Sequence, residues 1–305
     1  MNTIHKQTLK WNNYHLNVLN STKAQCITKI GSTEAIYISE FIKTGGEHYN
    51  PKAYDLSMAC GVHFSSHESQ NRWCEAYITG IKSSDYLHLW HEYYFQRNID
   101  KQPIKNRLEQ RWTDQFIYES LKNKMNIKNE PISSSAGDIN PITLGEDSWH
   151  LNLKDKKVLV VSNAQKTFEY QAERYHKLWN GATLGGFEFV KIPSSEHLAC
   201  DNPTNQLEWS KKVDNAKNEI AKKNFDFAIV GCGGIGLILT DYIKNTCGKS
   251  CTYIGGIVQL LFGIRGNRWE HCKGWYNNND YWIKPFEEDI PENYKVNEGG
   301  CYWVT

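Results

Sequence analysis

The stretch "FDFAIVGCGGIGLILT", residues 225–240, decides the fold class. An apolar run is followed by Gly231, Gly233 and Gly236, which have the G-x-G-x-x-G spacing of dinucleotide-binding turns. Such a turn joins a buried strand to a helix in a parallel α/β sheet. The stretch therefore predicts a strand, a glycine turn and a helix, in that order.

Strand and helix patterns alternate on both sides of this turn. Short apolar runs predict further strands at "KKVLVV" (156–161), "FEFVKI" (187–192) and "SCTYIG" (250–255). Helical periodicity predicts helices over 167–181, 205–223 and 235–248, and a short apolar helix over 256–263. This alternation predicts an α/β fold, with a Rossmann-like, mostly parallel sheet flanked by helices.

The first half of the chain has a more helical pattern. "CITKIG" (26–31) alternates like a strand and leads directly into "STEAIYISEFIK" (32–43), whose apolar residues lie on one helical face. Ser65 and Glu68 have the spacing of a capping box, which predicts a helix start. Residues 107–123 are a further helix candidate.

A change of composition separates the two halves. Residues 129–147 are rich in Pro, Ser and Gly and have little apolar periodicity, so we expect a boundary or a lid there. The predicted organisation is an N-terminal half, 1–150, and a Rossmann-like nucleotide-binding half, 151–305. One continuous domain remains the alternative.

Composition excludes several function classes. The 35 basic and 34 acidic residues nearly cancel, which gives no electrostatic basis for binding nucleic acid. The nine cysteines include no C-x-x-C pair, and we expect free thiols in a cytoplasmic protein. The sequence has no apolar stretch of the roughly 20 residues needed to span a bilayer, and peripheral association with a membrane stays open.

The glycine turn lacks one feature of a nicotinamide site. Dinucleotide-binding folds carry an acidic residue about 20 positions after the turn, where it binds the ribose hydroxyls. Here that region contains Tyr253, Ile254, Gly255 and Gly256 and no acid. Two interpretations remain for the turn: a backbone cradle for a diphosphate or another anion, or a tight strand-to-helix turn whose glycines permit close packing.

A second glycine turn follows at the same predicted edge of the sheet. Gly255 and Gly256 lie between the last predicted strand and the short helix. Beyond that helix, Arg265 and Arg268 precede Trp269 and could supply cations to a phosphate group. Arginines at a helix end also interact favourably with the helix dipole without any further role.

These residues carry a resemblance to a known family. Residues 225–270, "KVLVVSNAQKTFEYQAER" (157–174) and "YWIKPFEEDIPENYKVNEGGCYW" (281–303) resemble the GT-D-type glycosyltransferase-like proteins encoded in surface-polysaccharide gene clusters. The resemblance is close over about 150–303 and looser before it. It implies a GT-D-like fold and transfer of a sugar from a nucleotide-sugar donor to a glycan or lipid-linked acceptor.

The resemblance also implies a D-x-E-like motif near the N-terminus. The matching segment is "KIGSTEAIY" (29–37), with Glu34 as the second acid and Ser32 in place of the first. Glu34 is therefore the candidate catalytic residue and the candidate ligand of Mn²⁺ or Mg²⁺. Because a hydroxyl is a poor ligand for a hard cation, metal dependence stays open. Glu34 near a helix start would also stabilise the helix dipole without any other role.

The predicted site combines both glycine turns with these charged residues. Glu34 is assigned the role of base, and the candidate donor-binding residues are Gly231, Gly233, Gly234, Gly236, Gly255, Gly256, Gln259, Arg265 and Arg268. The alternatives are a nucleotide- or NAD-binding oxidoreductase or epimerase, and an inactive sugar-nucleotide-binding protein.

Overall fold

The computed structural model describes most of the chain. The described residues are 3–47, 60–90, 115–125, 127, 132–134, 147–193, 207–267, 279–296 and 300–303.

A single seven-stranded sheet forms the centre of the fold, with the strand order β3-β2-β1-β7-β6-β4-β5. Every pair of neighbouring strands is parallel. The strands are β1 (Cys26–Lys29), β2 (Tyr86–Trp90), β3 (Ile132–Ser134), β4 (Lys157–Ser162), β5 (Gly186–Lys191), β6 (Phe227–Val230) and β7 (Ser250–Tyr253). The predicted α/β, Rossmann-like fold is confirmed.

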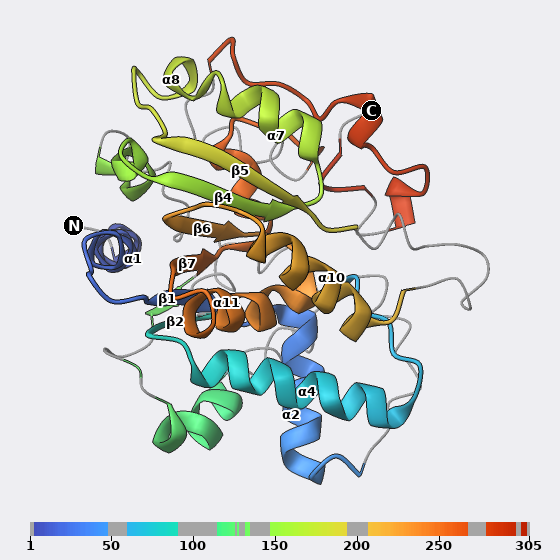
Figure 1. The fold of residues 1–305 in the computed structure, drawn as a ribbon. Coiled ribbons are helices and arrows are strands. Elements are labelled where there is room, and N and C mark those ends of the chain that lie inside the picture. Colours follow the sequence, from blue (N-terminus) through green and yellow to red (C-terminus); the bar gives the residue numbers. More distant parts are fainter. Residues whose placement is uncertain are drawn as a thin grey trace.

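Helices cover both faces of this sheet (Figure 1). The side chains of β4 alternate between two buried clusters, with Leu159 and Val161 in the first and Val158 and Val160 in the second. The first face carries α2 (Ser32–Thr44), α4 (His67–Lys82), α10 (Trp209–Ala221) and α11 (Gly236–Asn245). The second face carries α1 (Thr3–Leu19), η3 (Trp149–Leu153), α7 (Gln165–Ala172), α8 (Tyr175–Leu178) and α12 (Val258–Leu261).

The side on which each helix lies follows from the handedness of the crossovers. The steps β1→β2, β5→β6 and β6→β7 all move toward the β3 edge of the sheet, and their helices lie on the first face. The step β4→β5 moves the opposite way, and α7 lies on the second face. All these crossovers therefore share one hand, as parallel strands require.

This arrangement creates switch points at the carboxyl ends of the strands. The chain leaves β1 and β6 toward the first face, whereas it leaves β7, which lies between them, toward the second face. Open α/β sheets bind ligands where neighbouring strands send their chains to opposite faces. The carboxyl ends of β1, β7 and β6 are therefore the first place to look for a site.

Some local predictions differ from the structure. α4 begins at His67 and its N-cap is Ser66, whose hydroxyl accepts a hydrogen bond from the Ser69 backbone N–H. The predicted capping box of Ser65 and Glu68 is wrong by one residue, because Ser66 has the extended backbone of an N-cap and its oxygen reaches the N–H three positions on.

Other helix and boundary predictions are only partly matched. The single helix predicted over 167–181 is divided into α7 and α8. The helix predicted over 107–123 is described only from residue 115 onward, where residues 115–121 are helical. β3 lies inside the stretch 129–147 that we expected to be a boundary or a lid, and most of that stretch lies outside the described residues.

One sheet joins strands from both predicted halves of the chain, since β1 pairs directly with β7.

Within the described residues, no helix combines the length and the apolar character needed to cross a membrane.

Two buried histidines should make the fold sensitive to acid. Burial lowers the pKa of His15 and of His150 to about 3. The Nδ1–H of His15 donates to the Trp11 carbonyl at 3.0 Å, so Nε2, which lies 2.9 Å from the Thr252 hydroxyl, accepts in the neutral ring. Both imidazoles are therefore neutral in the folded protein at neutral pH.

We expect the free energy of unfolding to fall as the pH drops from 6.5 toward 3, because His15 and His150 take up protons in the unfolded chain at a higher pH than in the folded protein. Between pH 7.5 and 5.0, urea unfolding should show a loss of about 2 kcal/mol for each histidine. His15→Gln should reduce this pH-dependent loss by about half, whereas the same change at the exposed His176 should leave it unaltered. Equal pH dependence in all three proteins would contradict the neutral assignment of His15.

Candidate functional site

The first part of the site is the turn between β1 and α2. Gly31 is the N-cap of α2 and its backbone N–H donates to the Tyr77 hydroxyl at 3.1 Å. A Cβ at Gly31 would collide with the carboxylate of Glu34, which folds back over this position. Gly31 therefore makes room for the Glu34 carboxylate directly beyond the end of β1.

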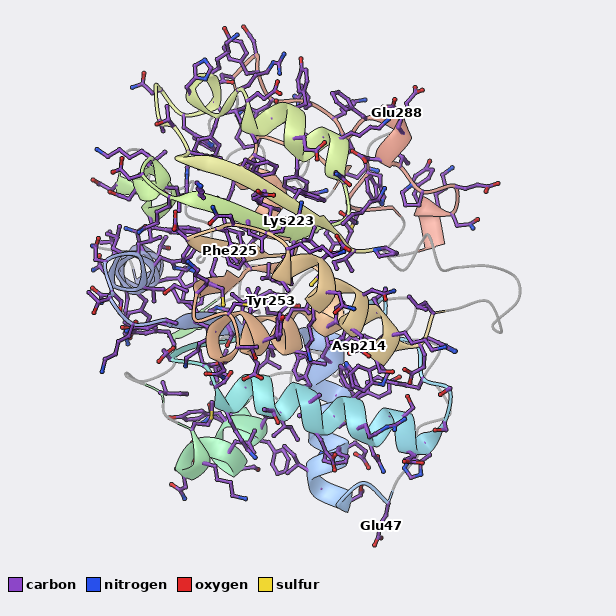
Figure 2. The ribbon with its side chains drawn as sticks, in the orientation of Figure 1. Glu47, Asp214, Lys223, Phe225, Tyr253 and Glu288 are labelled. Carbon is purple, nitrogen blue, oxygen red and sulfur yellow. The ribbon has the colours of Figure 1, made fainter. Side chains whose placement is uncertain are left out.

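Glu34 is buried in this position, with 4% of its surface exposed. Within the described part of the chain, no group donates a hydrogen bond or forms an ion pair with its carboxylate. The charge of Glu34 also acts on Tyr253: burial is the main cause that raises the pKa of the Tyr253 phenol, and Glu34 is the next. Figure 2 shows Tyr253 in the interior of the protein.

A lysine lies at the same point of the sheet. Lys29 is the last residue of β1, and its Nζ lies 5.3 Å from the centre of the Tyr253 ring. A Cβ at Gly255 would lie 3.0 Å from the Lys29 Cε and 3.3 Å from its Nζ, so the end of the lysine side chain lies against Gly255. We call this group, composed of Lys29, Gly31, Glu34, Tyr253 and Gly255, the β1/β7 site.

The glycine turn after β6 (residues 231–236, the β6 turn) is packed against other parts of the chain. Gly233 has a left-handed backbone, with φ of 61°, and a Cβ there would collide with the carbonyl oxygen of Cys60. A Cβ at Gly234 would collide with Val62, and one at Gly236 with the Tyr253 ring.

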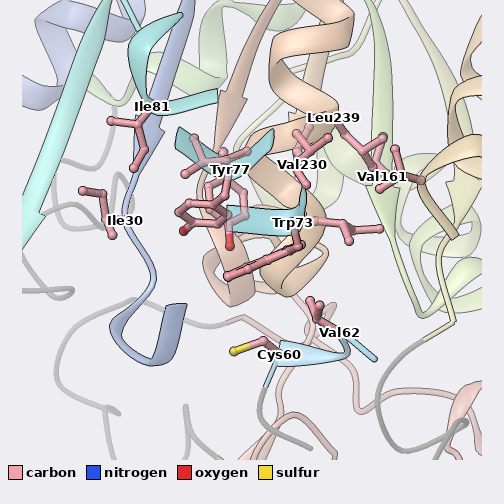
Figure 3. Packing of buried hydrophobic residues seen from close by; sticks show 14 of the residues in the cluster. Ile30, Cys60, Val62, Trp73, Tyr77, Ile81, Val161, Val230 and Leu239 are labelled. Carbon is pink, nitrogen blue, oxygen red and sulfur yellow. The ribbon is translucent and has the colours of Figure 1, made fainter. Parts of the chain in front are cut away.

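Hydrogen bonds fix the same contacts. Trp73 Nε1 donates to the Gly234 carbonyl at 3.0 Å, and the Tyr253 hydroxyl donates to the Gly233 carbonyl at 3.0 Å. In Figure 3, Trp73 lies between Tyr77 and the short segment that carries Cys60 and Val62. The structure thus shows a packing role for these glycines, and their donor-binding role stays a prediction.

The segment that covers the β6 turn, residues 60–64, is itself held by α10. The buried Lys212 donates from Nζ to the Gly61 carbonyl at 2.9 Å. The Trp209 backbone N–H donates to the His63 carbonyl at 3.1 Å. These contacts fix segment 60–64 against the β6 turn.

The other predicted donor-binding residues on the second face contact the C-terminal part of the chain. Arg265 donates from its guanidinium to the Trp282 carbonyl at 3.1 Å, and no described contact joins it to either glycine turn. Gln259 donates to the Tyr302 carbonyl at 3.2 Å. Gly256 is partly exposed beside Gly255. Arg268 lies outside the described residues.

No protein-family model, curated protein or solved structure matches the chain. The function is therefore inferred from the geometry of the site and from the family resemblance in the sequence.

A further helix start at this edge is already occupied by an acidic side chain. Asp289, from the C-terminal part of the chain, accepts hydrogen bonds from the backbone N–H and the hydroxyl of Thr167, both at 2.7 Å. It thereby caps the first turn of α7, whose own N-cap residue, Ala164, provides no side-chain hydrogen bond. The N-terminus of α7 is not available to a ligand phosphate.

The structure gives no evidence for a metal centre among the described residues, where no three His, Cys, Asp or Glu side chains are grouped so as to hold an ion. Ser32 is the first residue of α2 and Glu34 lies in its first turn. This position is compatible with both roles considered for Glu34, stabilisation of the helix dipole and direct contact with a substrate or metal.

Sequence reasoning missed Lys29, Tyr77 and Tyr253. Lys29 and Tyr253 are each the last residue of a strand, and these two strands are neighbours in the sheet. Both strands were predicted, but each prediction ended two residues later than the strand in the structure, at Gly31 and at Gly255. That β1 and β7 lie side by side was not predicted, because it depends on the strand order of the whole sheet.

The packing of the β6 turn can be tested with two glycines of similar backbone geometry. Gly233 and Gly248 have φ of 61° and 65°, but a Cβ at Gly248 would have no heavy atom within 4 Å. Gly248→Ala should cost about 1 to 2 kcal/mol of unfolding free energy, from the left-handed backbone alone. Gly233→Ala should cost about 1 to 3 kcal/mol more, because the new methyl group overpacks against Cys60. Equal losses in urea unfolding would show that segment 60–64 does not cover the turn.

Proposed function

We propose that this protein is a glycosyltransferase that moves a sugar from a nucleotide-sugar donor to a glycan or lipid-linked acceptor. The observation that carries the proposal is the Glu34 carboxylate, which is buried, has no described hydrogen bond and acts electrostatically on Tyr253, the ring over which the Lys29 ammonium lies. The family resemblance of residues 150–303 supports the same reaction class.

Glu34 is mostly buried at the carboxyl edge of the sheet, and no described group donates a hydrogen bond to its carboxylate. Open α/β sheets bind ligands at this edge, so a ligand could supply the donor. A sugar or acceptor hydroxyl would supply the missing hydrogen bond to Glu34. The structure thus offers a physical reason for substrate to bind at this position.

The proposed reaction uses Glu34 as general base. The acceptor oxygen forms a bond to the anomeric carbon of the donor sugar, and the acceptor proton passes to the Glu34 carboxylate. The bond between the anomeric carbon and the diphosphate oxygen breaks, and its electron pair leaves with the nucleoside diphosphate. This outcome inverts the anomeric configuration, and a nearby cation would stabilise the charge of the leaving group.

The packing of the β6 turn argues against an NAD-dependent enzyme. In dinucleotide sites the second glycine of the fingerprint allows the pyrophosphate to approach the backbone. Here the corresponding space at Gly233 is filled by the Cys60 carbonyl. The fingerprint spacing of the sequence is therefore explained by internal packing.

A thermal-shift screen tests the proposed function directly. The protein is heated with UDP-, GDP- and dTDP-sugars and with NAD(H), each with and without Mn²⁺, and compounds that raise its melting temperature are then assayed for sugar transfer and hydrolysis. Stabilisation by at least one nucleotide-sugar and release of its nucleoside diphosphate support the proposal. Stabilisation by NAD(H) alone contradicts it.

Glu34→Gln should separate the catalytic role from the helix-stabilising one. If Glu34 is the base, this variant should lower turnover about 10²- to 10⁴-fold and change donor affinity little, since the side chain keeps its shape. Its unfolding free energy should stay nearly unchanged, because no described hydrogen bond or ion pair of the carboxylate is lost. If Glu34 only stabilises the N-terminus of α2 through the helix dipole, turnover should be unchanged and the free energy of unfolding should fall by about 0.3 to 1 kcal/mol.

A further inference from the structure

We propose that Lys29 and the turn after β7 (residues 254–257, the β7 turn) form the binding site for the diphosphate of the donor, and that the β6 turn does not contact it. The nature of the ligand, a nucleoside diphosphate ester, rests on the function proposed above. The location of an anion site at Lys29 rests on the structure alone.

A comparison of the described turns after β4, β6 and β7 supports the location. The turn into α7 is occupied by the Asp289 carboxylate. The β6 turn is covered by Cys60, Val62 and the Tyr253 ring. At Gly255 in the β7 turn, by contrast, an added Cβ would meet only the far end of one side chain, that of Lys29.

The position of the Lys29 ammonium is fixed by its neighbours. Its carbon chain passes over Gly255, whose left-handed backbone (φ of 61°) and missing side chain leave the necessary space. The ammonium lies over the Tyr253 ring, a favourable cation–π arrangement. Tyr253 is itself held by its hydrogen bond to the Gly233 carbonyl. A cation is thus present at the switch point before any ligand binds.

The two charges of the site have complementary roles. An ammonium group is a strong point charge for phosphate oxygens, whereas a carboxylate accepts hydrogen bonds from hydroxyls and repels phosphate. Lys29 and Glu34 lie on either side of the Gly31 turn and both act on Tyr253. A ligand with a diphosphate at one end and a sugar hydroxyl at the other matches this pair of charges.

Calorimetric titration with UDP, GDP, dTDP and inorganic pyrophosphate tests the inference. Lys29→Met should lower the affinity for pyrophosphate and for the nucleoside diphosphate that binds by at least about tenfold, while the binding of the corresponding nucleoside stays unchanged. Lys29→Arg should retain most of the affinity. The control is Lys191→Met, which removes an exposed lysine from the carboxyl end of β5 in the same sheet.

A second pair of variants tests the β7 turn. Gly255→Ala should weaken binding to a similar extent because the methyl group displaces the end of Lys29. Gly248→Ala imposes the same backbone strain in open space and should leave binding unaltered. Melting curves of all variants identify any that fail to fold.

The outcomes distinguish this inference from the proposed function. Unchanged affinity in a folded Lys29→Met protein, or no binding of any of these anions to the unmodified protein at millimolar concentration, overturns the inference. Lys29-dependent binding without any sugar transfer supports the site and contradicts the function. Sugar transfer that is insensitive to Lys29→Met supports the function and contradicts the site.

Discussion

The Tyr253 side chain makes the contacts on which the rest of the site depends. Its ring fills the space that Gly236 leaves, its hydroxyl donates to the Gly233 carbonyl, and the Lys29 ammonium lies over its face. One buried side chain at the end of β7 thus links the β6 turn to the β1/β7 site. A smaller residue here would leave the glycine turn unsupported and Lys29 without its aromatic partner.

This arrangement gives the dinucleotide-type glycine pattern a role in internal packing. A glycine at such a turn permits close approach of another group, but the sequence does not specify which group approaches. In this protein the approaching groups are the Cys60 carbonyl, Val62 and Tyr253. Because those contacts come from residues far away in the sequence, the motif alone could not distinguish packing from phosphate binding.

The sequence predicted individual strands and helices better than it predicted which of them contact one another. Period-two and apolar patterns located β1, β4, β5, β6 and β7, since such patterns are local properties of the chain. The helix α1 and the strands β2 and β3 of the first half were not predicted. The Asp289 cap of α7 could not be predicted either, because it joins residues more than a hundred positions apart.

In the candidate site, too, local sequence patterns were predictable and contacts between distant residues were not. Glu34 was identified through the family resemblance, but its burial and its lack of a described hydrogen bond depend on the fold around Gly31. Lys29 carries no motif of its own, and only the pairing of β1 with β7 brings it to Gly255. Residues whose roles depend on strand order, and not on local pattern, are the ones that required the structure.

Ligand phosphates should bind at the ends of β1 and β7 and not at the glycine turn after β6. A crystal structure of the protein with UDP, or with the nucleoside diphosphate that binds in its place, measures this directly. We expect phosphate oxygens within hydrogen-bond distance of Lys29 Nζ, with segment 60–64 still packed on Gly233 and Gly234. Phosphates bound to the backbone of residues 233–236, with Cys60 displaced, would contradict it.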